Sequence, residues 1–288
     1  MTSSITDHSI KETALKVSID EGQNKESGLG SEGRGVGYIT LTRGEIHNAF
    51  DDQLIADLTS AFEAMQNNDD VEVVVLNAEG KSFSAGADLN WMRRMADYSW
   101  DENYQDSQAL AKLMNTIYSL NKPTVCVVQG AAFGGGVGLV ACCDIVIASE
   151  KAIFCLSEVK LGLIPAVISP YVVKAIGERQ AQRYFLTAER FNASEAKSYG
   201  LVHEVVSPEA LTDKTNQMIS SLLANGPQAV VAAKDLIRLV EGKPITQDLM
   251  DETAKRIADI RASEQGKEGL NAFLEKRPAN WSNTTNSH

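Results

Sequence analysis

Three consecutive glycines stand in the middle of a long uncharged stretch, and they restrict the fold of this chain more than any other feature. Residues 123–143 contain no charged side chain and are about as long as a membrane span. Gly134, Gly135 and Gly136 propagate a helix poorly, because glycine loses the most backbone entropy when it is ordered. We therefore expect a short valine-rich strand, a glycine loop and a short helix here, and not a membrane span.

The same unit of strand, turn and helix recurs along the chain. The consecutive apolar residues of 71–77 predict a buried strand, because a half-exposed strand would alternate apolar and polar residues. Strands are predicted at 14–19, 37–42, 71–77, 124–128, 144–148, 152–155 and 202–206, and helices from 51, over 102–120, up to 143, and over 227–240 and 246–261. This alternation is typical of an α/β fold.

Composition bounds the organisation of the chain. With 288 residues, 43% of them hydrophobic, it is long enough for one large domain with a helical appendage. We expect a core over residues 1–205, in which the Gly- and Ser-rich stretch 22–35 forms a mobile loop. A helical region should follow over 206–277, and a disordered polar tail over 278–288.

Charge and cysteine usage exclude several classes of partner. The 38 acidic and 27 basic residues give a net charge of −11, which opposes binding to nucleic acid or anionic lipid. The four cysteines lie in apolar stretches without the spacing of a zinc or dithiol site, so we expect reduced thiols and no metal. The first ten residues lack the apolar region of a secretory signal, and a cytoplasmic location is expected.

Three segments that follow predicted strands can carry chemistry. The small residues of 83–89 let a ligand approach the backbone, and a helix begun by Asp88 would present free amides, although a turn chosen only for packing looks the same. The glycines of 130–138 lack the signatures of phosphate and dinucleotide loops, and an amide aimed at a carbonyl oxygen fits better. Glu158 stands among apolar neighbours, where desolvation would suit a general acid or base, unless it only pairs with Lys160 or caps a turn.

Taken together, these segments resemble the crotonase (enoyl-CoA hydratase) family, in the family's order and from about residue 37 to residue 281. The matching residues are Ala85-Gly86-Ala87-Asp88, then Gly134-Gly135-Gly136, then Glu158 ahead of Leu161-Gly162 and Pro165. The resemblance implies a ββα-superhelix core and a C-terminal helical region that forms trimers or hexamers. It also implies an acyl-CoA substrate, with coenzyme A as part of that substrate and no separate cofactor.

The resemblance assigns roles to individual residues. The amides of Ala87 and Gly135 would form an oxyanion hole for the thioester, and Glu158 would transfer a proton at the acyl chain. Contacts with coenzyme A are expected from Ala85, Ala87, Asp88, Leu89, Asn90, Gly134 and Gly135. Residues 246–276 would lie in contacts between subunits.

One position departs from the family pattern. The best-known hydratases carry a second glutamate two residues after the glycine triplet, where this chain has Gly138. Residues 132–134, 139–144 and 166–171 resemble the bacterial 3-methylglutaconyl-CoA hydratases, which also lack it. We therefore expect hydration of 3-methylglutaconyl-CoA to 3-hydroxy-3-methylglutaryl-CoA in leucine or isoprenoid catabolism.

Alternatives remain open at this point. A Δ3,Δ2-enoyl-CoA isomerase needs only one proton shuttle, and a CoA- or RNA-binding protein without activity would not need Glu158. A glutaconyl substrate requires a cation for its free carboxylate, for which Arg93, Arg94 and Lys160 are candidates, although each is also typical of ordinary surface charge.

Overall fold

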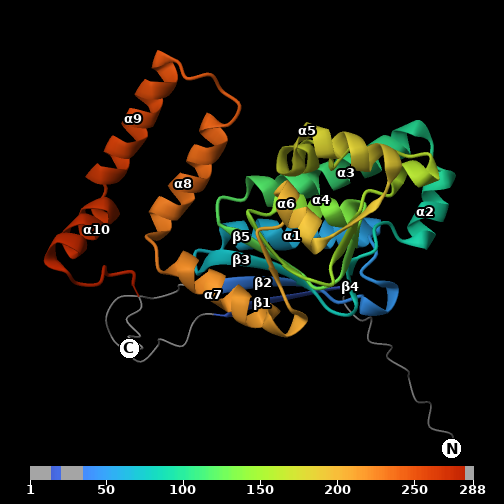
Figure 1. Cartoon of the computed structure of the whole chain (residues 1–288), viewed down its shortest axis with the longest axis horizontal. Coiled ribbons are helices and arrows are strands. Elements are labelled where there is room, and N and C mark those ends of the chain that lie inside the picture. The colour runs from blue at the N-terminus through green and yellow to red at the C-terminus, as the bar shows by residue number, and fades with distance from the viewer. Residues whose placement is uncertain (1–13, 21–34, 283–288) are drawn as a thin grey trace, which may run out of the picture.

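The computed structural model describes residues 14–20 and 35–282, and a six-stranded sheet lies at their centre, in the order β1-β2-β3-β5-β7-β10. β1 and β2 are antiparallel, whereas the later neighbours are parallel. The strands are β1 (Leu15–Asp20), β2 (Gly35–Leu41), β3 (Val71–Ala78), β5 (Thr124–Val128), β7 (Ile145–Ser149) and β10 (Glu204–Val206). The α/β class predicted from the alternation of elements is confirmed (Figure 1).

Helices pack on both faces of this sheet, and β3 shows why its residues are all apolar. Val74 and Leu76 belong to the larger core, which also contains residues of the helices α1 to α6. Val73 and Val75 point the other way and pack with Leu211 of α7. The helices are α1 (Asp52–Asn67), α2 (Leu89–Ala96), α3 (Trp100–Ser119), α4 (Gly135–Cys142), α5 (Ser169–Thr187), α6 (Ala193–Tyr199) and α7 (Leu211–Leu223).

Side-chain caps fix where several helices begin. The Asp51 carboxylate accepts the Leu54 N–H at 2.8 Å and starts α1. Ser99 and Glu102 form a capping box, in which each side chain accepts the other's backbone N–H, and start α3. Such caps satisfy amides that the first helical turn leaves without partners.

A second, smaller sheet has the order β4-β6-β8-β9. It consists of β4 (Ser82–Ser84), β6 (Ala131–Phe133), β8 (Ile153–Cys155) and β9 (Arg190–Asn192). β4, β6 and β8 are parallel, and β9 is antiparallel to β8. All four strands span three residues, too few to show a period, and only β8 was predicted.

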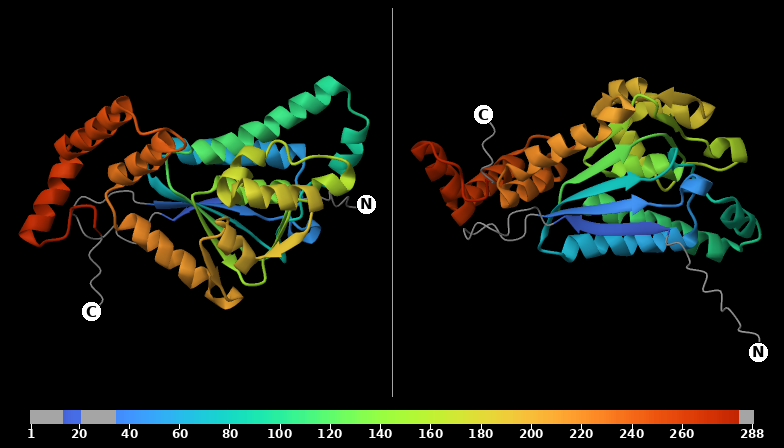
Figure 2. Two further views of the ribbon diagram at one scale, coloured as in Figure 1. Left: turned by 45° about the horizontal axis from the view of Figure 1, so that its top comes forward. Right: turned by 90° about the horizontal axis from the view of Figure 1, so that it is seen from below.

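Helices α8 (Pro227–Val240), α9 (Gln247–Ala262) and α10 (Glu264–Glu275) extend away from the sheets (Figures 1 and 2). The buried Lys234 of α8 ties them to the core: its Nζ lies 2.5 Å from Asp144 Oδ2 and donates to the Lys122 carbonyl oxygen at 2.8 Å. A partly buried ion pair thus ties the extension to the core.

The predicted limits of the core, of the mobile loop and of the tail differ from the structure. α7 packs on the sheet, so the core continues beyond the predicted limit at residue 205. Gly35, which we assigned to a mobile loop, begins β2, while 22–34 lie outside the described residues. The predicted disordered tail begins too early, because the Asn280 N–H donates to Glu268 Oε1 at 2.9 Å; residues 283–288 lie outside the described ranges.

The uncharged stretch 123–143 divides among β5, β6 and α4, as its glycines predict. Within the described ranges, none of the helices combines the length and the apolar character that a bilayer crossing requires.

Candidate active site

The three segments singled out in the sequence meet at one edge of the smaller sheet. The register of that sheet places Ser84 beside Ala132, and Phe133 beside Cys155. Because β4, β6 and β8 run parallel, the residues that follow them leave the sheet at the same edge. The segments that contain Ala87, Gly135 and Glu158 are therefore neighbours, although more than 70 residues separate the first from the last.

The turn after β4 holds Ala87 between two backbone hydrogen bonds. The Phe50 N–H donates to the Gly86 carbonyl oxygen at 2.7 Å, and the Asp88 N–H donates to the Phe50 carbonyl oxygen at 2.6 Å. Gly86 has a φ of 91°, which favours glycine strongly. No acceptor within the described part of the chain receives the Ala87 N–H.

The turn after β6 is held by Gly134. Its N–H donates to the Cys155 carbonyl oxygen at 2.9 Å, and its own carbonyl oxygen accepts the Val137 N–H at 2.9 Å, which starts α4. As the first residue of this helix, Gly135 has an N–H that finds no acceptor among the described residues.

Phe50 links the two turns. Its backbone pairs with the segment around Ala87, and its ring covers Gly135, where an added Cβ would lie 3.3 Å from Phe50 Cε2. Two free amides thus lie on neighbouring turns that share one contact residue.

Glu158 begins the short helix η2 (Glu158–Leu161) beside the second turn. A Cβ atom on Gly134 would lie 3.2 Å from Glu158 Oε1. Oε2 is buried and has no hydrogen-bond partner within the described residues. Burial raises the pKa of this carboxyl group, and a hydrogen bond from its own backbone N–H lowers it by less.

The alternative interpretation of Glu158, a pair with Lys160, is wrong. Lys160 is exposed, and no ion pair joins the two side chains in the described structure. A buried carboxylate oxygen without a partner costs free energy unless a ligand or water satisfies it.

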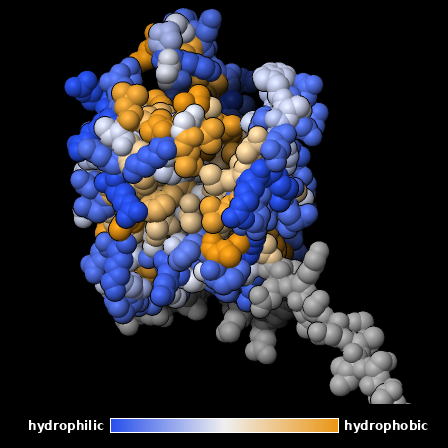
Figure 3. All heavy atoms as spheres, turned by 90° about the vertical axis from the view of Figure 1, so that its right-hand side faces the viewer, coloured by the Kyte–Doolittle hydropathy of each residue, from blue (hydrophilic) through white to orange (hydrophobic). Residues whose placement is uncertain are grey.

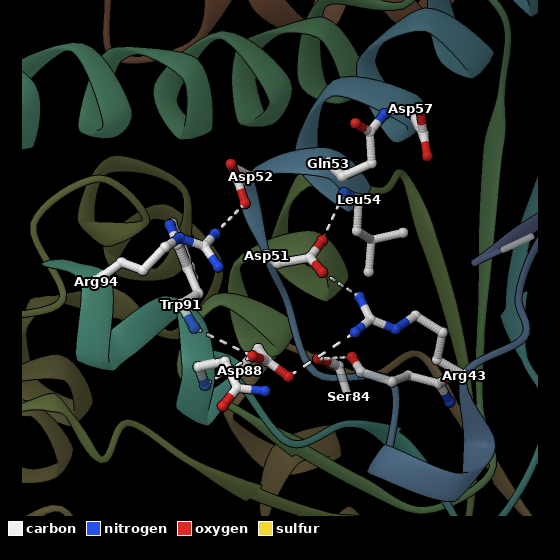
Figure 4. A network of polar contacts seen from close by, with 12 residues as sticks. Arg43, Asp51, Asp52, Gln53, Leu54, Asp57, Ser84, Asp88, Trp91 and Arg94 are labelled. Atoms are coloured by element: carbon white, nitrogen blue, oxygen red, sulfur yellow. Dashed lines mark hydrogen bonds and ion pairs between the residues drawn. The ribbon is translucent and has the colours of Figure 1, made fainter. Parts of the chain in front are cut away.

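Arg43 joins the two helix starts that border the Ala87 turn (Figure 4). Its Nη1 lies 2.6 Å from Asp51, the N-cap of α1, and its Nη2 lies 3.8 Å from Asp88, the N-cap of α2. Asp88 also accepts the N–H groups of Asn90 and Trp91. Sequence reasoning missed Arg43, because nothing in its local sequence indicates a contact with Asp88.

The remaining predicted contact residues lie at the start of α2. Leu89 is 69% exposed, and Asn90 accepts a hydrogen bond from Arg93. The face of the molecule on this side carries apolar side chains bordered by hydrophilic ones (Figure 3). Exposed apolar residues next to the segments also include Leu161, Leu163 and Ile164.

One cation considered in the sequence has a partner. Arg94 is paired with Asp52 on the surface, which leaves it less suited to bind a substrate carboxylate.

The sequence analysis also missed a cation near the site, Arg190. This residue of β9 lies opposite Cys155, and its guanidinium carbon is 5.3 Å from the centre of the Phe133 ring. Arg190 was missed because nothing in its local sequence indicates a strand or a contact with Phe133.

Comparison with known proteins gives the family. The family model described as "Enoyl-CoA hydratase/isomerase" matches residues 31–284. This chain belongs to that family. It is 32% identical over 253 residues to the mitochondrial enoyl-CoA hydratase of Pongo abelii, covering 85% of this chain and 83% of the relative.

Two further relatives sharpen the comparison. The 2,3-dehydroadipyl-CoA hydratase of Escherichia coli is 30% identical over 240 residues, covering 83% of this chain and 92% of the relative. The crystal structure of an enoyl-CoA hydratase from Shewanella pealeana superimposes with a TM-score of 0.85 at 45% identity, covering 93% of this chain and 95% of that one. The crotonase-like fold is thereby confirmed, and the chain is an enzyme of the enoyl-CoA hydratase type.

Proposed function

We propose that this enzyme adds water reversibly to the C2=C3 bond of a 3-substituted glutaconyl-CoA, with 3-methylglutaconyl-CoA as the first substrate to test. The observation that carries the proposal is Glu158 Oε2, a buried oxygen without a partner in the described residues, next to the turn of Gly134. A carboxylate in this state is ready to accept a proton.

The proposed chemistry divides between backbone and side chain. The N–H groups of Ala87 and Gly135 would donate to the thioester oxygen and stabilise the enolate, and one such donor is worth about 10² to 10³ in rate. Glu158 would take one proton from water as the water oxygen bonds to C3, and would then give that proton to C2. The product keeps the other hydrogen of water on its hydroxyl group, so atoms and charge balance.

A 3-substituted substrate suits a site with one acid. The substituent makes the new C–O bond tertiary, and a distal carboxylate on the substrate can hold the water that a second acid would otherwise hold. The relative from Escherichia coli is named for a substrate with such a distal carboxylate. In this chain we propose Arg190 as the cation for that group, because its guanidinium lies over Phe133 and forms no ion pair with a described acid.

Isomerisation is the second candidate, since Glu158 alone could move a proton between C4 and C2. The deciding experiment incubates the enzyme with 3-methylglutaconyl-CoA and with a 3-enoyl-CoA, and follows hydroxyl formation and double-bond migration by mass spectrometry and NMR. Hydration of the first substrate supports the proposal. Migration in the second without hydration of the first would show an isomerase.

The Glu158→Gln variant links either activity to this site. We expect a loss of at least about 10² in kcat, which is the usual range for a general acid or base. Full turnover by Glu158→Gln would contradict the assignment of Glu158.

We also propose that the enzyme is a homotrimer or homohexamer. Helices α8 to α10 and their connections expose large apolar side chains to solvent, and such patches usually mark contacts between proteins. The most exposed are Ile237, Ile245, Phe273 and Leu274. Light scattering with a Phe273→Ser/Leu274→Ser variant tests this, and a monomeric wild type would contradict it.

A further inference from the structure

Ile168 fills the space beside Gly138 of α4, one helical turn from the glycine that meets Glu158. Gly138 follows the N-cap Gly134 by four residues, and its N–H donates to the Gly134 carbonyl oxygen at 3.4 Å, so the two stand one helical turn apart. Over Gly134 lies the Glu158 carboxylate. Over Gly138 lies Ile168: an added Cβ would overlap Ile168 Cγ2 and lie 2.9 Å from Ile168 Cβ.

Ile168 has little freedom to move away. Its side chain is 2% exposed, and the neighbouring Met114, whose Cε would lie 3.2 Å from a Cβ on Gly138, is fully buried. Its carbonyl oxygen accepts the Val172 N–H at 3.0 Å at the start of α5. In a close-packed interior, a side chain held in this way yields only if its surroundings shift.

We propose that Ile168 is a specificity-determining residue: it excludes a side chain at position 138 and so prevents a second acid, within the part of the chain that the structure describes, from joining Glu158 at the start of α4. This inference rests on the proposed function. With one acid, the attacking water has a single protein partner, and a substrate that brings its own polar group is favoured. A straight-chain 2-enoyl-CoA such as crotonyl-CoA brings none and is a poor substrate.

The test opens the space and then installs an acid in it. Ile168→Gly removes the whole side chain and suits the start of a helix, because Ile168 is the N-cap of α5 and glycine is accepted there. Gly138→Glu is made alone and together with Ile168→Gly. The matched control combines Ile168→Gly with Ala141→Glu, which adds the same charge to α4 at a half-buried position three residues further on.

The expected result has two parts. Gly138→Glu lowers the melting temperature of the wild type at least twice as much as it lowers that of Ile168→Gly, which has lost stability of its own through the emptied space. The double variant then hydrates crotonyl-CoA with a kcat/KM at least about 10-fold above that of Ile168→Gly alone, because a second acid can orient water. The Ala141→Glu control shows no such gain.

Two results would overturn the proposal. In the first, Gly138→Glu keeps the wild-type melting temperature, which would show that Ile168 does not exclude a side chain at position 138. In the second, the double variant folds but hydrates crotonyl-CoA no better than the control. If Ile168→Gly prevents folding, Ile168→Ala with Gly138→Asp repeats the test with smaller changes. A wild type inactive on every enoyl-CoA would refute the proposed function, and the melting temperatures would still decide whether Ile168 excludes a side chain at 138.

Discussion

Glu158 Oε1 lies so close to Gly134 that a Cβ atom there would be 3.2 Å away. We expect Gly134→Ala to push the carboxylate out of place and to lower kcat by about 10-fold or more, since a displacement of about 1 Å in a catalytic group can cost about 10² in rate. Steady-state kinetics on the enoyl-CoA that the wild type converts would measure this loss.

The matched control for that variant is Gly242→Ala. Both glycines have positive φ values, 51° for Gly134 and 65° for Gly242, so each substitution strains the backbone by about 1 to 3 kcal/mol. A Cβ on Gly242 meets nothing within 4 Å. An equal loss of kcat in both variants would show that backbone strain, and not contact with Glu158, explains the effect.

Gly135→Pro should remove one proposed donor and leave the fold intact. Gly135 is the first residue of α4, where proline is well accepted because its missing N–H has no partner within the helix. We expect kcat to fall by about 10² to 10³. Gly135→Ala keeps the N–H and makes the same approach to the Phe50 ring, so it should retain much more activity; similar rates for the two variants would argue against a role for this amide.

The pKa of Glu158 predicts a pH-dependent gain in stability for Glu158→Gln. Burial raises the folded-state pKa above the unfolded value of about 4.3. The folded state therefore binds this proton more tightly, and the wild type loses stability as pH rises from the unfolded pKa through the folded pKa. Glutamine cannot ionise, so we expect Glu158→Gln to melt higher than the wild type at pH 8, by a margin that shrinks toward pH 4. A margin that stays constant with pH would contradict burial as the cause.

Arg43→Met should affect turnover more than binding. The guanidinium joins Asp51 and Asp88 across the Ala87 turn, and its removal lets that turn move without removing a substrate contact. We expect kcat to fall about 10-fold with a small change in KM, and Arg43→Lys to recover part of it. Arg94→Met is the control, because the Arg94 pair with Asp52 joins the same helices on the exposed surface. Equal effects of the two variants would assign Arg43 a structural role only.

The sequence predicted the bounds of an element best where the apolar pattern of that element is regular. β5 and α8 have the predicted bounds, and β3 follows its run of valines to within one residue. The three motifs were found because glycines and a lone acid stand out after strands. Contacts between distant residues left no such signal: Ile168 meets Gly138 across 30 positions, and Arg43 meets Asp88 through a side chain whose neighbours in the sequence are ordinary.

The short parallel strands β4 and β6 present main-chain groups at the edge where the segments meet, and this has an evolutionary consequence. Main-chain donors survive almost every point mutation, whereas the acid function depends on the Glu158 carboxylate and on Ile168 over Gly138. The ability to activate a thioester can therefore persist while a few substitutions of side chains change the reaction that the enolate undergoes. Proteins with this fold can therefore evolve from one reaction to another without an inactive intermediate.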